Sequence, residues 1–342
     1  MHDIAALAEP LAIGNVTVPN RVFLAPMSGV TDQAFRLRAH QAGAGLTVSE
    51  MVASGELAKG RAESVRRIRL AGVPVQSVQL AGREAAAMAE GARIAEEGGA
   101  DIIDINMGCP AKKVTGGYCG SALMRDPDHA LSLVRAVVAA VSVPVTLKMR
   151  LGWDGDSMNA PLIARMAQDA GVAMITVHGR TRMQFYKGRA DWRAIHAVRK
   201  AVSVPLVANG DVETAADAAA ILAQSGADAV MIGRGHYGQP WLAGSIARAA
   251  GAAGGQLPVP AGGEALAEYV IEHYRAMLAL YGEQSGLRQA RKHLGWYLDR
   301  HAPACPQDRR AAIMTGTDPQ AVIDALRMVL TNTTFTQTRR AA

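Results

Sequence analysis

Short apolar runs alternate with segments of helical spacing along the first 235 residues. Runs of four to six apolar residues, without an alternating polar face, are typical of strands buried on both sides of a parallel sheet. Two signals introduce them, a Val-Pro pair and a Gly-Ala-like turn, and they alternate along the chain. In order they lie at Val18-Pro19, 42–50, Val73-Pro74, 98–106, Val143-Pro144, 170–178, Val204-Pro205 and 225–233. The pattern therefore predicts eight strands.

Helical periodicity fills the intervals between these runs. The clearest segments are 83–97, 127–141, 190–202 and 214–224. Eight β-α units in about 250 residues match the size of a (β/α)8 barrel. A doubly wound sheet, the alternative, would rarely alternate two start signals so evenly. We therefore predict an α/β fold with a TIM barrel over residues 1–250.

The pattern changes after the predicted barrel. Residues 251–263, GAAGGQLPVPAGG, indicate a linker. Helical spacing over 264–334 predicts a small C-terminal helical bundle, and we expect 335–342 to be a disordered tail. A bundle in this position could bind a partner or could simply cap the barrel.

Composition narrows the class of protein. Hydrophobic residues make up 49% of the 342 positions and charged residues 19%, as in a folded globular protein. The longest nearly uncharged apolar run, 136–147, is too short to span a bilayer. A signal peptide begins with basic residues, but no Lys or Arg precedes Arg21 in this chain. We expect a cytoplasmic protein that does not bind membranes. The three cysteines show no metal-ligand spacing, so we expect no metal.

Polar and glycine residues gather where the predicted strands end, which is where TIM barrels carry their chemistry. NGD (209–211) and GRG (233–235) follow the seventh and eighth strands, a common phosphate-binding position, although such glycines could also serve only as tight turns. Lys148 ends another strand and could hold an anionic cofactor, form a Schiff base or pair with Asp104. Gln79 and Asn106 could present donors and acceptors to a heterocycle.

Two further strand-end residues are open to several interpretations. His178 could be a general acid, a phosphate ligand or a core histidine. Cys109, in NMGCP (106–110), could be an apolar filler, but its place at a strand end favours a reactive role. Cys119 lies within YCGSAL, and we expect it to pack.

The strand-end stretches, taken together, resemble the tRNA-dihydrouridine synthases over nearly the whole chain. The NMGCP stretch is the most specific of them, and RKHLGWYL (291–298) is similar to the C-terminal region of the bacterial B-type subfamily. The stretches that carry the resemblance are APMSGVTD (25–32), QLAG (79–82), DINMGCPAKKV (104–114), VTLKMRLGWD (145–154), ITVHGRTR (175–182), VANGD (207–211) and GRG (233–235).

The resemblance implies an FMN enzyme that uses NADPH or NADH to reduce a D-loop uridine of tRNA to 5,6-dihydrouridine. Hydride would reach carbon 6 of the uracil from reduced flavin, and Cys109 would donate the proton to carbon 5. The cofactor residues it implies are Ala25, Pro26, Met27, Gln79, Lys148, His178, Asn209, Gly210, Asp211, Gly233 and Arg234. His178 could instead face the uracil. The substrate residues are Asn106, Arg150, Arg291 and Lys292.

The residue chemistry fits this scheme. A thiol with a pKa of about 8.5 is mostly protonated at neutral pH and can supply a proton. Lys112 and Lys113 could lower that pKa or could hold a phosphate. The glycine-rich segment 111–120 suits a lid, and Lys148 would stabilise the anionic reduced flavin.

A basic cluster within the C-terminal segment suits RNA. Residues 288–310 contain six Lys or Arg against two Asp, a local net charge of +4, with Trp296 and Tyr297 among them. Arg291 and Lys292 could also be a solvated helix face. The alternatives are a flavin barrel acting on a small pyrimidine, with Cys109 as a base, and a non-catalytic RNA-binding or regulatory protein. We expect a monomer.

Overall fold

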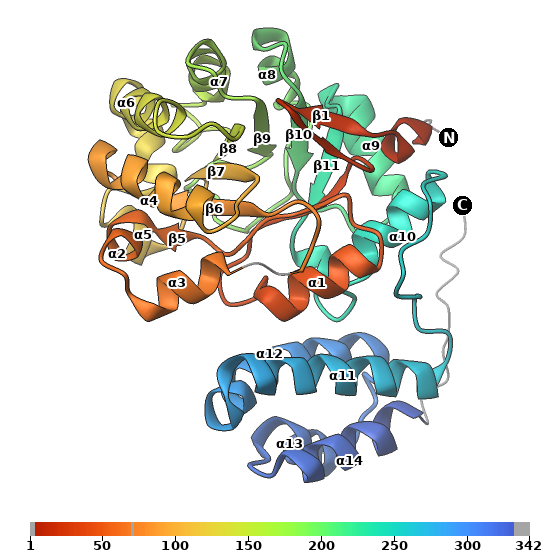
Figure 1. Ribbon diagram of the computed structural model, residues 1–342. Coiled ribbons are helices and arrows are strands. Elements are labelled where there is room, and N and C mark those ends of the chain that lie inside the picture. Colours follow the sequence, from red (N-terminus) through yellow and green to blue (C-terminus); the bar gives the residue numbers. More distant parts are fainter. Residues whose placement is uncertain (1–3, 70–71, 332–342) are drawn as a thin grey trace. The chain divides into compact units, whose positions relative to one another are not determined.

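The computed structural model describes residues 4–69 and 72–331 of the chain (Figure 1). The predicted tail, 335–342, lies outside the described residues. The chain divides into two compact units. The barrel unit runs to Gly235 and includes Leu242–Gln256; the helical unit consists of His236–Trp241 and the described residues from Leu257 on. The sequence predicted a barrel domain of residues 1–250, a linker of 251–263 and a helical domain of 264–334.

Parallel strands form the sheet of the barrel unit, in the order β4-β3-β11-β10-β9-β8-β7-β6-β5. The strands are β3 (Val22–Leu24), β4 (Leu46–Thr47), β5 (Val52–Ala53), β6 (Ser77–Ala81), β7 (Ile102–Met107), β8 (Val145–Arg150), β9 (Met174–His178), β10 (Leu206–Asn209) and β11 (Ala229–Ile232). Val48, directly after β4, forms a parallel bridge with Ser77 of β6. β4 and β5 therefore act as one interrupted strand, and the sheet closes into the predicted eight-stranded barrel.

Helices surround these strands (Figure 1). They are α1 (Gln33–Gln41), α2 (Ser54–Ala58), α3 (Ala62–Ile68), α4 (Ala85–Glu97), α5 (Lys112–Thr115), α6 (Pro127–Val138), α7 (Ala160–Asp169), α8 (His196–Ala201), α9 (Ala215–Ser225) and α10 (Leu242–Ala249), with 3-10 turns η1 (Ala5–Ala8), η2 (Gly120–Arg125) and η3 (Arg234–His236). Local sequence explains several helix ends. The Thr214 side chain accepts from the Asp217 N–H and Asp217 accepts in return, a capping box that starts α9, and Gly226 in the left-handed region ends it.

One predicted helix begins later than its periodicity indicated. The pattern predicted a helix over 190–202, but α8 begins at His196. The Ala190 N–H donates to Asp211 at 2.7 Å and the Ala194 N–H to Asp191 at 2.9 Å, so these main-chain groups are used in a loop. Side-chain acceptors here compete with the helical hydrogen bonds.

The amino ends of the strands are closed by apolar packing. β1 (Leu11–Ile13) and β2 (Val16–Val18) form an antiparallel hairpin. Its buried residues join an apolar cluster with Phe23, Leu46, Ile102 and Val207. The polar side chains therefore lie at the other end, where barrel enzymes have their sites.

The helical unit contains α11 (Gly263–Tyr281), α12 (Glu283–His301), α13 (Gln307–Thr315) and α14 (Pro319–Thr331). Residues 251–262 form no helix or strand. α11 packs against α12 and α14 through a buried apolar face formed by Leu266, Val270, Leu294, Leu298, Leu326 and Leu330. None of the helices in the described chain combines the length and the apolar character that crossing a membrane requires.

Candidate active site

A chain of hydrogen bonds joins polar side chains on three neighbouring strands inside the barrel. Asp104 of β7, only 3% exposed, accepts from Thr146 of β8 and from the Gln79 amide of β6, each at 2.6 Å. The Gln79 carbonyl oxygen in turn accepts from the Asn106 amide at 2.7 Å. Burial raises the pKa of Asp104, and the two hydrogen bonds oppose that rise. This network fixes which way the Gln79 and Asn106 amides point.

Asn106 also positions the cysteine that follows it. Its side-chain oxygen accepts from the N–H groups of Gly108 at 3.1 Å and Cys109 at 2.9 Å. The Cys109 carbonyl is held from the other side by the Ser121 N–H and hydroxyl, at 3.1 and 2.9 Å. Cys109 is thus fixed directly after β7, and a role for Asn106 in contacting uracil stays a prediction.

Burial raises the pKa of the Cys109 thiol, opposed by a hydrogen bond from the Ala111 N–H and by the charges of Arg150 and Lys148. Lys112 and Lys113, which the sequence suggested as groups that lower it, are not among the causes of this pKa shift. Both are exposed on α5, where water screens their charges. The net result is a thiol that stays protonated at neutral pH.

Cys119 has a different setting. It is partly exposed on the segment after α5, and its thiol donates to the Gly117 carbonyl at 3.4 Å. Burial raises its pKa as well.

Lys148 of β8 is an ammonium group without a carboxylate partner among the described residues. Its Nζ donates to the Asn209 side-chain oxygen at 3.1 Å, and the Asn209 amide donates to the Met231 carbonyl at 2.7 Å. Burial lowers the pKa of Lys148 to about 8; the positive charge of Arg150 adds to this, and Asp104 opposes it. The sequence left open that Lys148 pairs with Asp104. The structure does not support this pairing, because the Asp104 carboxylate accepts from Gln79 and Thr146 instead.

The segments after β3, β10 and β11 meet at the same end of the barrel. The Ala25 N–H donates to the Ile232 carbonyl at 2.9 Å, and a Cβ on Gly233 would lie 3.6 Å from the Met27 sulfur. The Gly233 and Arg234 N–H groups donate to no acceptor in the described part of the chain. Two main-chain donors thus lie beside the Ala25–Met27 segment.

Asp211 holds the phosphate-loop candidate in place. It lies in the left-handed region, with φ 54°, after Gly210 at φ 127°. Its carboxylate accepts from Arg180 at 2.8 and 2.6 Å and from Arg234 at 3.3 Å. Burial would raise the pKa of Asp211, but the hydrogen bonds from Arg180 and the Ala190 N–H, with the charges of the two arginines, hold it below its usual value.

His178 is kept neutral by its surroundings. Arg180 Nη1 lies 3.2 Å from His178 Nε2, and because arginine only donates, that nitrogen must accept and the ring proton must be on Nδ1. Burial lowers the pKa of His178 well below its usual value, and the charges of Arg150 and Lys148 lower it further. These features disfavour the general-acid role at neutral pH.

Two arginines of this site are almost fully buried, and the sequence did not reveal what they do. Arg150, 2% exposed, donates to the carbonyl oxygens of Gly108, Thr181 and Phe185. Burial lowers its pKa to about 10. A contact between Arg150 and uracil stays a prediction. Arg180 was not among the predicted site residues, although it lies inside the HGRTR stretch that could have drawn attention to it.

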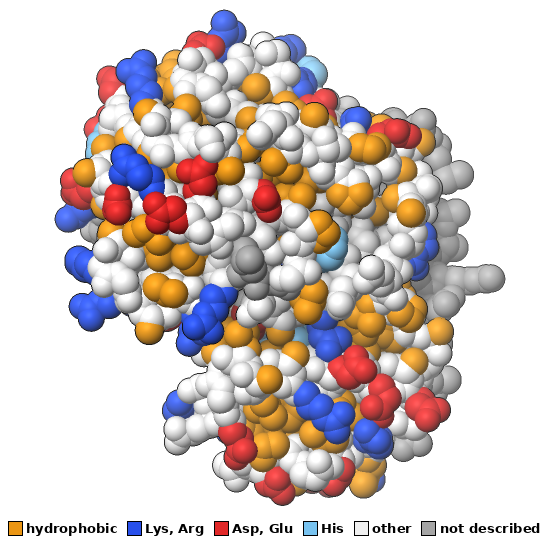
Figure 2. Space-filling view, in the orientation of Figure 1, with side chains coloured by type: hydrophobic (Ala, Val, Ile, Leu, Met, Phe, Trp, Pro, Cys, Tyr) orange, Lys and Arg blue, Asp and Glu red, His pale blue; other side chains and the backbone are white. Residues whose placement is uncertain are grey.

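The predicted RNA-binding cluster lies on α12 and α13 of the helical unit. Arg291 and Lys292 lie on α12, and the Lys292 ammonium donates to Gln289 at 2.9 Å. Arg310 pairs with Asp299 at 2.7 Å. Figure 2 shows basic and acidic side chains mixed on the visible face of this unit.

One of the two aromatic residues of that cluster, Tyr297, is not open to bases, which corrects the expectation from sequence for that residue. Tyr297 is 1% exposed and its hydroxyl is 3.0 Å from His273 Nδ1. Trp296 stacks on Tyr237, with ring centroids 3.8 Å apart and an interplanar angle of 4°. Helical periodicity puts Tyr297 on the inner face of α12 with Leu294 and Leu298, and Trp296 has a partner far from it in sequence.

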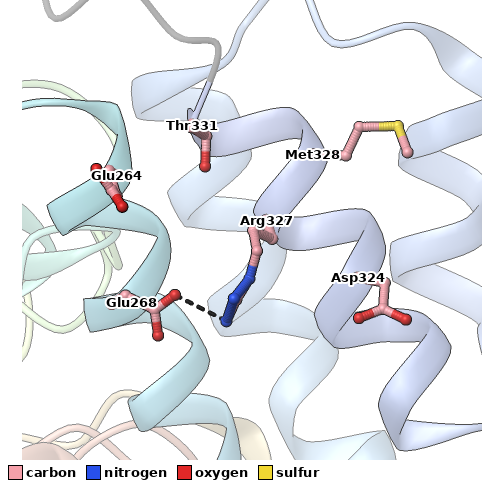
Figure 3. Close-up of a pocket in the computed structure, with 6 residues that line it drawn as sticks. All are labelled: Glu264, Glu268, Asp324, Arg327, Met328 and Thr331. Atoms are coloured by element: carbon pink, nitrogen blue, oxygen red, sulfur yellow. Dashed lines mark ion pairs between the residues drawn. The ribbon is translucent and has the colours of Figure 1, made fainter.

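A cavity of about 430 Å³ lies between α11 and α14 (Figure 3). Its lining is Glu264, Glu268, Asp324, Arg327, Met328 and Thr331, and Arg327 pairs with Glu268 at 2.7 Å. Three carboxylates against one guanidinium make this surface unfavourable for a phosphate backbone. Among the described residues, no group of three or more His, Cys, Asp or Glu side chains could hold a metal ion.

Fold and strand-end residues together define a TIM-barrel protein whose candidate site lies at the carboxyl ends of the strands. Known structures share this fold. The chain superposes on 2-naphthoyl-CoA reductase with a TM-score of 0.58 and 14% identity, over 72% of this chain and 52% of the other, so it spans about half of that protein. For morphinone reductase the TM-score is 0.51 with 18% identity, over 73% of this chain and 90% of the other.

Sequence comparison then gives the family. The model of the family "Dihydrouridine synthase (Dus)" matches residues 23–334. A probable tRNA-dihydrouridine synthase of Rhizobium leguminosarum bv. phaseoli is 62% identical over 90% of this chain and 94% of its own length. A tRNA-dihydrouridine synthase B of Xanthomonas campestris pv. campestris is 47% identical over 93% of this chain and 95% of its own length. The chain belongs to the dihydrouridine synthase family, as the resemblance of its strand-end stretches predicted.

Proposed function

We propose that this protein reduces a D-loop uridine of tRNA to 5,6-dihydrouridine, with FMN as cofactor and NADPH or NADH as reductant. The family and the names of its relatives support a tRNA-dihydrouridine synthase. One observation carries the chemistry. A thiol that stays protonated, Cys109, shares the mouth of the barrel with an ammonium group, Lys148, that has no carboxylate partner among the described residues.

The residues present fit FMN. The two main-chain donors at Gly233 and Arg234, with the Arg234 guanidinium, suit the ribityl phosphate beside Asn209, Gly210 and Asp211. Ala25, Pro26 and Met27 offer an apolar lining, and Gln79 an oriented amide for the polar edge of the ring. Lys148 supplies the positive charge that an anionic reduced ring needs, and neutral His178 offers its Nδ1–H as a donor. Bound flavin supplies the hydride for carbon 6 of the uracil.

Cys109 provides the other half of the reduction. Addition of hydride at carbon 6 leaves negative charge at carbon 5 and the adjacent carbonyl, and the Cys109 sulfur donates its proton there. The hydrogen bonds of Asn106 and Ser121 to the Cys109 main chain hold the thiol at the strand end. A raised thiol pKa keeps the proton available at neutral pH.

The remaining parts of the proposal concern binding and location. Arg291 and Lys292 on α12 contact the tRNA backbone, and the target uridine is turned out of its stack to reach the barrel mouth. The protein works as a cytoplasmic monomer without a metal.

Flavin release and product analysis test the proposal. Heating the purified protein should release FMN, about one per chain, and the holoenzyme with NADPH should form dihydrouridine in tRNA lacking D-loop modification, detected by mass spectrometry. Free uracil and uridine should not be reduced. Release of FAD, failure to bind FMN on reconstitution, or reduction of the free pyrimidine without tRNA would overturn it.

A further inference from the structure

The segment of residues 181–188, which follows β9 and is called here the 181–188 loop, is held by the two buried arginines. Arg150 donates to two of its carbonyl oxygens at 2.9 and 2.8 Å, and Arg180 donates to two more at 3.2 and 2.6 Å. The four acceptors are the carbonyls of Thr181, Phe185, Lys187 and Gly188. A planar guanidinium presents its donors in a rigid arrangement, so it fixes the positions of the carbonyls that it binds.

The 181–188 loop is also tied to the segment after β8. The Met183 N–H donates to the Trp153 carbonyl at 2.9 Å, and the Arg182 guanidinium lies 4.7 Å from the Trp153 ring and 4.8 Å from the Phe185 ring. Its shape is therefore defined at both ends and in the middle.

Phe185 has an unusual backbone conformation, with φ 51°. A bulky L-residue in the left-handed region is uncommon and strained, so it persists where surrounding contacts hold it. Here the Phe185 carbonyl accepts from Arg150 at 2.8 Å, a contact that helps to hold the residue in this conformation. Strain of this kind concentrates at binding sites, and its local effect is to set the direction of the next side chain, Tyr186.

The Tyr186 side chain is exposed to solvent rather than packed in the core. Its side chain is 50% exposed, in a chain where the aromatic residues of the core are buried. The Arg150 guanidinium carbon lies 5.5 Å from its ring centroid and that of Arg234 lies 4.9 Å away. The ring thus lies between the strand-end arginine and the proposed phosphate site, while half of its surface is open.

We propose that Tyr186 is a stacking surface for an unpaired nucleotide next to the uridine that enters the barrel. This rests on the proposed function, because a tRNA whose uridine is turned out of its stack leaves the neighbouring bases without one stacking partner. An aromatic ring accepts any base, and nearby guanidinium groups attract the adjoining phosphates. The two buried arginines act as positioning residues that keep the ring in place before RNA arrives.

The test combines a local probe of stacking with kinetics, using the full-length holoenzyme. Transcripts of tRNA carry 2-aminopurine at the nucleotide before or after the D-loop uridine that is reduced, since stacking on an aromatic ring quenches its fluorescence. Wild type and Tyr186→Phe should quench one of the two probes, and Tyr186→Ala should not. The loss of one stacked base predicts that Tyr186→Ala lowers kcat/KM for tRNA about 5- to 150-fold.

Two further measurements separate this role from a structural one. Flavin bleaching by NADPH, without tRNA, should be the same in Tyr186→Ala and wild type. Leu162→Ala, which removes another exposed side chain from the outer helix α7, should leave quenching and kcat/KM unchanged.

Equal quenching by wild type and Tyr186→Ala, or quenching of neither probe by wild type, would overturn the proposal. The quenching can be read from flavin-free protein as well. A wild-type protein that quenches the probe but forms no dihydrouridine would therefore leave the stacking role standing and remove the proposed function instead.

Discussion

Replacing Lys148 by Met should make the flavin-free protein more stable at pH 7. The charged ammonium is held where burial and the charge of Arg150 disfavour it, and its one hydrogen bond, to Asn209, does not compensate. Met has a similar length and needs no hydration. The protein keeps the lysine, on our proposal, because an anionic cofactor and its reduced form offset the cost when bound.

The size of the effect follows from the pKa of Lys148, which falls from 10.5 to about 8. A difference of about 2.5 units corresponds to roughly 3 kcal/mol between the charged and neutral states. The ammonium is not completely shielded from water, and the substitution leaves the Asn209 oxygen without its donor, a loss of about 1 kcal/mol. We therefore expect a gain of about 2 kcal/mol in the free energy of unfolding at pH 7.

The direction of the Lys148 pKa shift also determines how the free energy of unfolding depends on pH. Between pH 8 and 10.5 the unfolded chain binds the Lys148 proton more tightly than the folded chain, so this group makes wild-type stability rise with pH across that window. Lys148→Met lacks this contribution, and its advantage should shrink to nothing by the upper end of the window.

Urea unfolding of the flavin-free proteins at several pH values measures both effects. Lys112→Met, which removes an exposed lysine of α5, is the matched control and should change stability little. A Lys148→Met protein that is no more stable than wild type at pH 7, or whose difference from wild type is independent of pH, would refute the reasoning about burial.

Two other predictions concern turnover and RNA binding. Cys109→Ala should accept hydride from NADPH normally yet form dihydrouridine about a hundred- to ten-thousand-fold more slowly, while Cys119→Ala stays close to wild type. Mass spectrometry of the tRNA measures the product, and flavin bleaching measures hydride transfer from NADPH. Normal product formation by Cys109→Ala would remove the acid role. The double variant Arg291→Gln, Lys292→Gln should weaken tRNA binding and lower the slope of log affinity against log salt by about two, with Arg93→Gln on α4 as control. An unchanged slope, measured by fluorescence anisotropy, would make both residues a solvated face.

The fold could be predicted because its signals are local. Pro144 and Pro205 stand just before β8 and β10, where a residue without an N–H cannot pair in the sheet, and each strand contains apolar residues that mark it in the sequence. The late start of α8 could not be predicted in this way, because it depends on Asp211, far along the chain, binding the Ala190 N–H. The break between β4 and β5 likewise depends on pairing with different neighbours.

The sequence could predict which residues lie near the carboxyl ends of the strands and so form the candidate site. Asn209 ends β10, Asn106 and Lys148 lie close to the ends of β7 and β8, and Gln79 lies in the middle of β6. Parallel strands bring their carboxyl ends together. The sequence does not say which of these groups bind one another. That Asn106 holds Cys109 could not be inferred without coordinates. Composition also misled: aromatics among basic residues suggested base stacking, yet Tyr297 faces the core of the helical unit.

The two ionisable groups at the centre of the site titrate in an unusual order. Burial acts on a thiol and an ammonium in opposite directions, because it disfavours the charged form of each. The pKa of Cys109 rises from 9.0 while that of Lys148 falls to about 8, so Lys148 loses its proton first as pH increases. In water a cysteine would ionise before a lysine. If the two groups act as proposed, the same burial keeps Cys109 protonated as the acid, and loss of the Lys148 proton limits the alkaline range of the activity.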